Sequence, residues 1–345
     1  MKAWTALVLL AGCAGDHRVA STAEIVVMAP TRANAGPPGG GAPSDLVVMN
    51  LDGTERVQIT HDDRLEFLPH FAPDATRVVY TKFERGTYGT PGAVTDIAVY
   101  DFTAAAETLL THRGDAAQAA WSPDGSTIAF LVHGPSTGAS ELWLMDADGA
   151  HQRRVAASSG RDDDAVWGDI AWSSDDWILF VVAEQPAGPC FKVRLDKMRP
   201  DASERTKVSD GGPNCTPPGM EQSGDADPGF SADGRTIYTS RGLPQSPPGA
   251  TQPPGSPLIL TERKLLALSS DPWTAGKLET DLSLPSEPDC IEGVPKGSPD
   301  GTRVLVFRMC FGRGAGPAGV YLSDAAGSFR IFVADGFGPD WNPTR

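Results

Sequence analysis

One short phrase recurs six times along this chain of 345 residues, and the copies begin 44 to 67 residues apart. Its fullest form is Trp121-Ser122-Pro123-Asp124-Gly125. The six copies begin at Phe71, Trp121, Trp172, Phe230, Gly297 and Trp341. A run of β-branched or aromatic residues follows each of the first five copies, as is typical of a strand. Because Pro-Asp-Gly suits a tight turn between two strands, each copy predicts a β-hairpin.

A second pair of strands completes the repeated unit. Residues 45–49 and 56–59 form one such pair, and residues 141–145 and 152–155 form another; an Asp-Gly turn lies within each pair. We therefore predict an all-β fold built from four-stranded antiparallel units. Six such units describe a six-bladed β-propeller.

The two ends of the chain favour a closed ring. The last copy, Trp341-Asn342-Pro343, ends directly after the innermost strand of its unit. The strand that this unit lacks is present near the N-terminus, at residues 24–28. We therefore expect the N-terminal strand to pair with the C-terminal repeat, which would remove exposed strand edges.

The repeat resembles that of the TolB-type propeller family, whose units carry a Trp-Ser-Pro-Asp-Gly phrase and an Asp-x-Asp-Gly turn. The resemblance covers roughly residues 23–345. It implies a propeller fold and a surface on which envelope partners dock. We expect similarity to the propeller part of TolB only, because this chain leaves no room for the additional N-terminal α/β domain of TolB.

The first residues are typical of an export signal. Lys2 is followed by a short apolar run that ends in Leu10-Ala11-Gly12-Cys13, which resembles the lipobox of bacterial lipoproteins. We expect a signal peptide at residues 1–12, a lipid on Cys13, a tether at residues 13–22 and a single propeller at residues 23–345. An ordinary signal peptide with a chance cysteine is the alternative.

These features predict an exported lipoprotein that contacts the membrane only through its lipid anchor. The residue after Cys13 is Ala14 rather than Asp, which in the sorting logic of such lipoproteins favours the outer membrane. The protein would then face the periplasm or the cell surface. The net charge of −15 argues against a surface that binds nucleic acid; its other interpretation is solubility.

Four cysteines remain once Cys13 is set aside, and an even count in an exported chain predicts two disulfides. The strand assignments place Cys190 near Cys215, and Cys290 near Cys310, on one face of the ring. We therefore predict the pairs Cys190–Cys215 and Cys290–Cys310. A metal site is disfavoured because the chain has no CxxC motif.

Two places could carry function. Long loops between the second and third strands of the units would gather on one face and display a binding surface. Alternation along the innermost strands would bring polar residues together at the mouth of the central channel. These residues are His70, Gln118, Asp169, Asp227, Lys296 and Asp340.

The channel residues leave two interpretations open. Asp169, Asp227 and Asp340, together with His70, could bind Ca²⁺ or Mg²⁺ through oxygen ligands. Alternatively, the channel is polar and filled with water, and Lys296 neutralises one carboxylate.

The first functional hypothesis is a lipid-anchored scaffold without enzymatic activity, which binds an envelope protein or peptide through the loop-rich face and the channel mouth. The second is a propeller lyase or hydrolase that acts on a sugar or lactone with a metal in the channel. The sequence assigns no catalytic residue.

Overall fold

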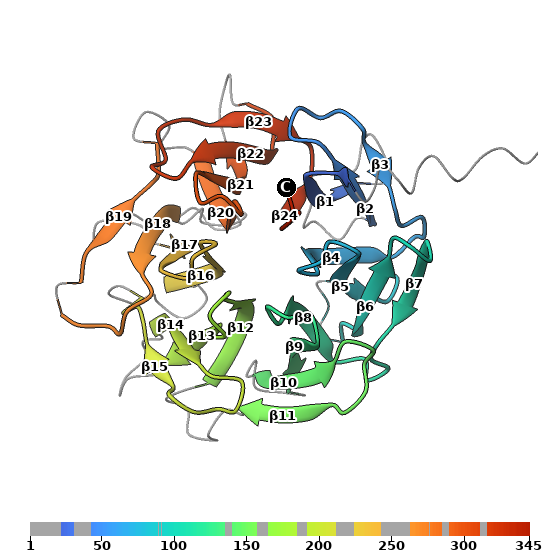
Figure 1. The fold of residues 1–345 in the computed structure, drawn as a ribbon, viewed down its shortest axis with the longest axis horizontal. Helices are drawn as coiled ribbons and strands as arrows, with labels where there is room; N and C mark the ends of the chain where they lie inside the picture. The colour runs from blue at the N-terminus through green and yellow to red at the C-terminus, as the bar shows by residue number, and fades with distance from the viewer. Residues whose placement is uncertain are drawn as a thin grey trace, which may run out of the picture.

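The computed structural model describes most of the chain and builds it from β-strands (Figure 1). The described residues are 22–30, 43–88, 90, 92–134, 140–156, 165–184, 192–211, 224–242, 263–275, 277–284, 290–310 and 316–345. The regular elements among them are the strands β1 to β24. Within these ranges the structure contains no helix with the length and apolarity needed to cross a bilayer.

The strands follow one another in groups of four, from the centre of the molecule outward (Figure 1). The innermost strands are β4 (Leu65–Phe71), β8 (Ala116–Trp121), β12 (Ala165–Trp172), β16 (Gly224–Phe230), β20 (Cys290–Gly297) and β24 (Phe337–Trp341). The second strands are β1 (Ile25–Pro30), β5 (Arg77–Phe83), β9 (Thr127–His133), β13 (Ile178–Glu184), β17 (Thr236–Gly242) and β21 (Arg303–Cys310).

The third and fourth strands lie progressively closer to the periphery (Figure 1). The third strands are β2 (Ser44–Met49), β6 (Thr95–Asp101), β10 (Ser140–Asp146), β14 (Lys192–Met198), β18 (Arg263–Ser269) and β22 (Gly319–Asp324). The outer strands are β3 (Val57–Gln58), β7 (Ala106–Leu109), β11 (Arg153–Ala156), β15 (Thr206–Lys207), β19 (Glu279–Asp281) and β23 (Ile331–Ala334). Pairing within each group is antiparallel, as predicted; β20 to β23 form a four-stranded sheet of their own.

The two ends of the chain meet in one sheet. Strand β1 pairs with β24, so that Ile25 lies opposite Trp341 and Val26 opposite Asp340. Beyond the strands, Asn342 Nδ2 donates a hydrogen bond of 2.8 Å to the carbonyl oxygen of Ala23. The predicted pairing between the N-terminal strand and the C-terminal repeat is therefore present.

The repeated phrase forms the turn between the first and second strands of a group. Ser122 Oγ donates to Asp124 Oδ1 at 2.6 Å and accepts from the backbone nitrogen of Thr127 at 2.9 Å. Gly125 has a φ of +69°, which a glycine adopts without steric cost. The same contact between serine and aspartate recurs at Ser173, Ser231 and Ser298. The phrase recurs because one turn geometry recurs.

The apolar core lies mainly between neighbouring groups of strands. One cluster joins Val26 and Leu46, in the group of strands formed by β24 and β1 to β3, to Val78, Tyr80 and Ala98 in the β4–β7 group. The aromatic residues that open the phrase also contact the preceding group. The indole nitrogen of Trp121 donates to the carbonyl oxygen of His70 at 3.3 Å, and the guanidinium of Arg77 lies 4.6 Å from the Trp121 ring.

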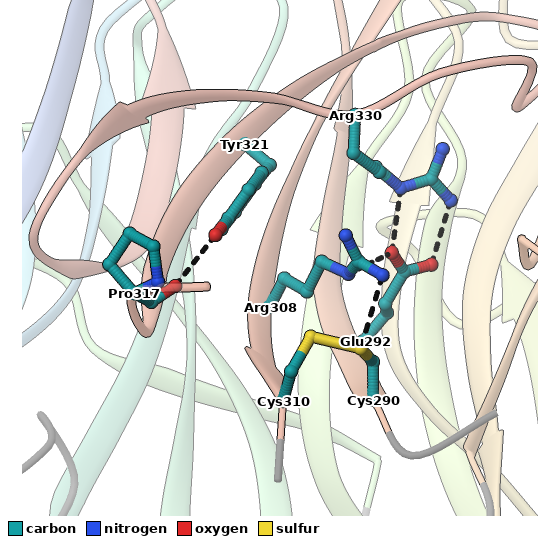
Figure 2. Close-up of a disulfide and its surroundings, with 7 residues drawn as sticks. All are labelled: Cys290, Glu292, Arg308, Cys310, Pro317, Tyr321 and Arg330. Atoms are coloured by element: carbon teal, nitrogen blue, oxygen red, sulfur yellow. Dashed lines mark hydrogen bonds and ion pairs between the residues drawn. A yellow bond between two sulfur atoms is a disulfide. The ribbon is translucent and has the colours of Figure 1, made fainter. Parts of the chain in front are cut away.

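A disulfide joins the ends of two paired strands (Figure 2). Cys290 begins β20, and Cys310 ends β21 directly opposite it. This pair was expected from the strand assignments and is confirmed. Cys190, Cys215 and Cys13 lie outside the described residues, so the second pair and the lipid anchor stay predictions.

Candidate functional site

Each innermost strand contains an irregular residue three positions before the opening residue of the phrase. At these positions the backbone is left-handed, with φ between 40° and 56°. The residues are Leu68, Gln118, Asp169, Asp227, Val294 and Gly338. The register with the neighbouring strand shifts at each of them, as in a β-bulge. The strict alternation assumed from the sequence is therefore wrong here, because a bulge interrupts every innermost strand.

Three of the predicted channel residues form a chain of hydrogen bonds across adjacent groups. Gln118 Nε2 donates to Asp169 Oδ1 at 2.6 Å, and the backbone nitrogen of Asp169 donates back to the Gln118 side chain. Asp169 Oδ2 then accepts from the backbone nitrogen of Asp227 at 3.0 Å. Asp227 Oδ2 accepts from Ser240 Oγ at 2.7 Å. The carboxylates thus satisfy backbone donors that the bulges free from the strand pairing.

Replacing Asp169 with Ala should lower the free energy of unfolding by about 1–3 kcal/mol, because the amide of Asp227 and the side chain of Gln118 both lose a partner. Asp169→Asn should cost less, since it keeps one acceptor oxygen and asparagine tolerates left-handed backbone. Urea denaturation of the two variants tests this. Equal losses in both would contradict the role given to the acceptor oxygens.

The other three predicted channel residues lie together nearer the turns. Asp340 Oδ2 accepts a hydrogen bond of 2.8 Å from the backbone nitrogen of Phe71 and lies 3.7 Å from His70 Nδ1. Burial lowers the pKa of His70, the positive charge of Lys296 lowers it further, and Asp340 opposes both. Burial also lowers the pKa of Lys296, against the opposing effects of Asp340, Asp169 and Asp227.

The carboxylates at the axis do not gather as a set of metal ligands. Over the described ranges, the group with three acidic ligand atoms within 4.8 Å of one another is Asp62, Glu66 and Glu107. The ammonium of Lys82 already lies among these carboxylates, 2.5 Å from Asp62 and 2.6 Å from Glu107. The carboxylate oxygens of Asp169, Asp227 and Asp340 do not form such a group within 4.8 Å of one another. Each of these carboxylates accepts a hydrogen bond from a protein donor.

A cavity of about 440 Å³, here called the funnel, opens at the axis among the turns of the repeated phrase. His70, Lys296 and Asp340 are its ionisable lining residues. Aromatic rings and prolines make up much of the rest of the wall: Phe71, Pro73, Trp121, Pro123, Trp172, Phe230, Pro299, Trp341 and Pro343. The wall is therefore largely apolar, with a few polar groups that could orient a ligand.

The channel narrows beyond the funnel. His70 and Lys296 also line a space of about 20 Å³, together with Gln118, Asp169 and Asp227. A space of this size holds about one water molecule. The six predicted residues therefore divide between the funnel and this constriction.

The funnel opens on the face of the short turns. The long loops expected to form a binding surface leave the opposite ends of the strands, and most of their residues lie outside the described ranges. Sequence reasoning missed the turn residues Ser174, Ala232 and Pro299 as part of the funnel wall. The signal was present, because a phrase repeated at one end of every innermost strand must surround the axis.

Comparisons with known proteins agree with this fold. A family model described as the TolB beta propeller domain matches residues 37–197. The Tol-Pal system protein TolB of Anaeromyxobacter dehalogenans is 27% identical over 123 residues. That match covers 36% of this chain and 26% of the relative, so it spans about a quarter of the length of TolB.

Solved structures extend the likeness in fold over nearly the whole chain. TolB from Acinetobacter baumannii superposes with a TM-score of 0.61 at 17% identity, covering 93% of this chain and 67% of that one. An oligogalacturonate lyase in complex with manganese gives a TM-score of 0.51 at 14% identity, covering 82% and 72%. Sequence identities this low support a shared fold and not a shared function. The repeat and the fold of this chain are therefore similar to those of TolB β-propeller proteins.

Proposed function

We propose that the chain forms a closed six-bladed propeller that binds a protein or peptide partner in the cell envelope. The groups of four strands and the pairing of β1 with β24 support the ring. Its similarity to TolB proteins, one of which is named as part of the Tol-Pal system, supports a protein partner and an envelope location. The lipobox-like Leu10-Ala11-Gly12-Cys13 supports export and an anchor on the outer membrane.

The funnel is the observation that carries the binding proposal. Its aromatic and proline walls offer apolar surface to a side chain or a short peptide. His70, Lys296 and Asp340 supply a small polar base where a bound group would be fixed in orientation. Because the space behind them measures about 20 Å³, a partner would enter the funnel from the turn face.

Blocking the funnel tests the proposal. Ser174 is an exposed residue of the wall, so Ser174→Trp should fill the mouth without disturbing the core. Thr103→Trp, at an exposed turn of the β4–β7 group outside the funnel, is the matched control. The full lipidated chain is purified from detergent-solubilised envelope after chemical crosslinking. Wild type and Thr103→Trp should recover one partner in equal amounts, and Ser174→Trp at least tenfold less.

Recovery of the same proteins by all three chains would contradict partner binding at the funnel.

The alternative function, a metal-dependent lyase or hydrolase, is tested by a separate measurement. Metal analysis of the purified chain, before and after chelation, should then give one equivalent of Ca²⁺ or Mg²⁺ that Asp169→Asn removes. A metal content below 0.1 equivalent would count against that alternative.

A further inference from the structure

The fifth copy of the phrase lacks the aromatic residue that opens the others, and a tyrosine from the preceding group of strands lies in its place. Gly297 stands where the other five copies carry Trp or Phe. A Cβ on Gly297 would lie 2.9 Å from Cε2 of Tyr238, so the tyrosine ring already occupies that place. Tyr238 is opposite Gly229 in its sheet, and the corresponding position opposite His70 is Val79. The aromatic ring at this interface thus comes from the preceding group of strands.

A groove of about 920 Å³ runs along this same interface, between the β16–β19 and β20–β23 groups. It shares Ser231, Ala232 and Pro299 with the funnel, so the two hollows are continuous on the turn face. At the outer part of its wall is Leu278, which is 88% exposed. This is the most exposed of the large hydrophobic side chains in the part of the chain that the structure describes.

The turns beside the groove are acidic. Asp233 and Asp300 line it from its two sides, and both are exposed. Hydrogen bonds from Ser298 and from Thr302 lower the pKa of Asp300 to about 2, and the hydroxyl of Ser231 lowers that of Asp233 in the same way. Both carboxylates are therefore ionised at neutral pH.

The acidity extends around the funnel mouth. Each of the first five phrases places an exposed aspartate at its turn: Asp74, Asp124, Asp175, Asp233 and Asp300. Basic residues accompany these aspartates: Arg235 lines the groove near Asp233, Arg303 lies near Asp300, and Lys197 lies near Asp175. A second copy of this chain, with its net charge of −15, is a poor match for such a face.

We infer that the funnel and the groove together bind an extended, cationic segment of a partner polypeptide. The segment would begin in the funnel, pass over Ala232 with a lysine or arginine near Asp233 and Asp300, and cover Leu278 with an apolar side chain. This inference rests on the proposed function and names the chemistry of the partner. The groove wall supports it through exposed Leu278, Asp233 and Asp300, and Tyr238 in that wall takes the place of a side chain at Gly297.

The test uses random 12-residue peptides displayed on phage and selected against the purified chain. Selected sequences should be enriched in lysine or arginine. One of them, made synthetically and labelled with fluorescein, is then titrated with wild type and variants by fluorescence anisotropy. Leu278→Ser and Asp300→Asn should each raise Kd at least tenfold, and 0.5 M NaCl should weaken binding to a similar degree.

Matched controls separate the groove from general effects. Ile331→Ser removes another exposed aliphatic side chain, 56% exposed on β23, and should change Kd less than twofold. Asp52→Asn alters an exposed turn between β2 and β3 that lines neither the funnel nor the groove, where the carboxylate also accepts from a backbone nitrogen and a threonine hydroxyl, and should leave Kd within twofold. Suppose that Ser174→Trp abolishes binding while Leu278→Ser and Asp300→Asn do not affect it. The proposed role of the groove is then contradicted, and binding at the funnel remains supported. Selected peptides without cationic residues, or no selected peptide at all, would also overturn the inference.

Discussion

Replacing Arg241 with Met is expected to lower the free energy of unfolding by about 3–5 kcal/mol, the loss typical of breaking a buried ion pair. Arg241 is 8% exposed, and its partner Asp225 is fully buried. The guanidinium Nε lies 2.5 Å from Asp225 Oδ1, and Nη2 lies 2.8 Å from Glu279 Oε1. Burial raises the pKa of Asp225 even with the arginine present. Without Arg241, the buried carboxylate loses this counterion, and it must stay charged beside the hydroxyl of Ser209 or take up a proton.

Urea denaturation at pH 7 measures the loss. Lys264→Met is the matched control, because Lys264 and Asp281 form an ion pair of 2.9 Å whose side chains are 37% and 42% exposed. Solvent screens such a pair, so the control should lose about 1 kcal/mol or less. A loss in Arg241→Met no larger than in Lys264→Met would show that Asp225 does not depend on the arginine.

The same ionic contact is built into three groups of strands. Glu66 lies opposite Lys82, Asp225 opposite Arg241, and Glu292 opposite Arg308 in their sheets. Figure 2 shows the third case, in which Glu292 also binds Arg330 at 2.6 Å. In each pair the basic residue follows the acidic one by sixteen positions. This regular spacing is a signal that the sequence itself carries.

The order of the strands could be predicted because hydrophobic alternation and turn chemistry are local properties of the sequence. The pairing of Ile25 with Trp341 and the Cys290–Cys310 bond follow directly from that order. The bulges could not be predicted in this way. Residues as different as Leu68, Gln118 and Asp169 adopt the same left-handed backbone, because neighbouring groups of strands impose it.

The grouping of the six polar residues near the axis could be predicted, but the shape of the spaces that they line could not. The six polar residues do lie at the axis, because a repeated phrase places equivalent positions there. Their division between a funnel and a constriction depends on the bulges. Tyr238 lines the groove, and its ring lies where a side chain on Gly297, 59 positions away in the sequence, would stand. No local sequence pattern predicts this contact between Tyr238 and Gly297.

Raising the pH from 5 to 9 is expected to destabilise the protein through Glu66. Its side chain is fully buried, and Oε1 has no hydrogen-bond partner within the described structure. The nearest cation is Lys82 Nζ at 3.6 Å, which Asp62 and Glu107 share. Burial is the main cause that raises the pKa of Glu66 from 4.5 to about 9, and the charge of Asp62 adds to it.

The sign follows from proton uptake on folding. The pKa of Glu66 is higher in the folded chain than in the unfolded one, so its contribution is fully present below about pH 4.5 and is lost as the pH rises to about 9. The slope is at most ~1.4 kcal/mol per pH unit, which gives a total of a few kcal/mol. Asp45, whose pKa burial raises to about 6, acts in the same direction below that pH. The pKa of Lys82 is raised from 10.5, so its effect falls above this window.

Glu66→Gln removes the titrating group and keeps a neutral side chain of the same size. Its free energy of unfolding, measured in urea at pH 5, 7 and 9, should decline less steeply than that of the wild type. At pH 9 the variant should be the more stable protein by a few kcal/mol. Glu55→Gln, at an exposed turn, should reproduce the wild-type slope. Parallel pH profiles for the wild type and Glu66→Gln would mean that Lys82 holds Glu66 ionised throughout, and that the buried carboxyl exchanges no proton when the chain unfolds.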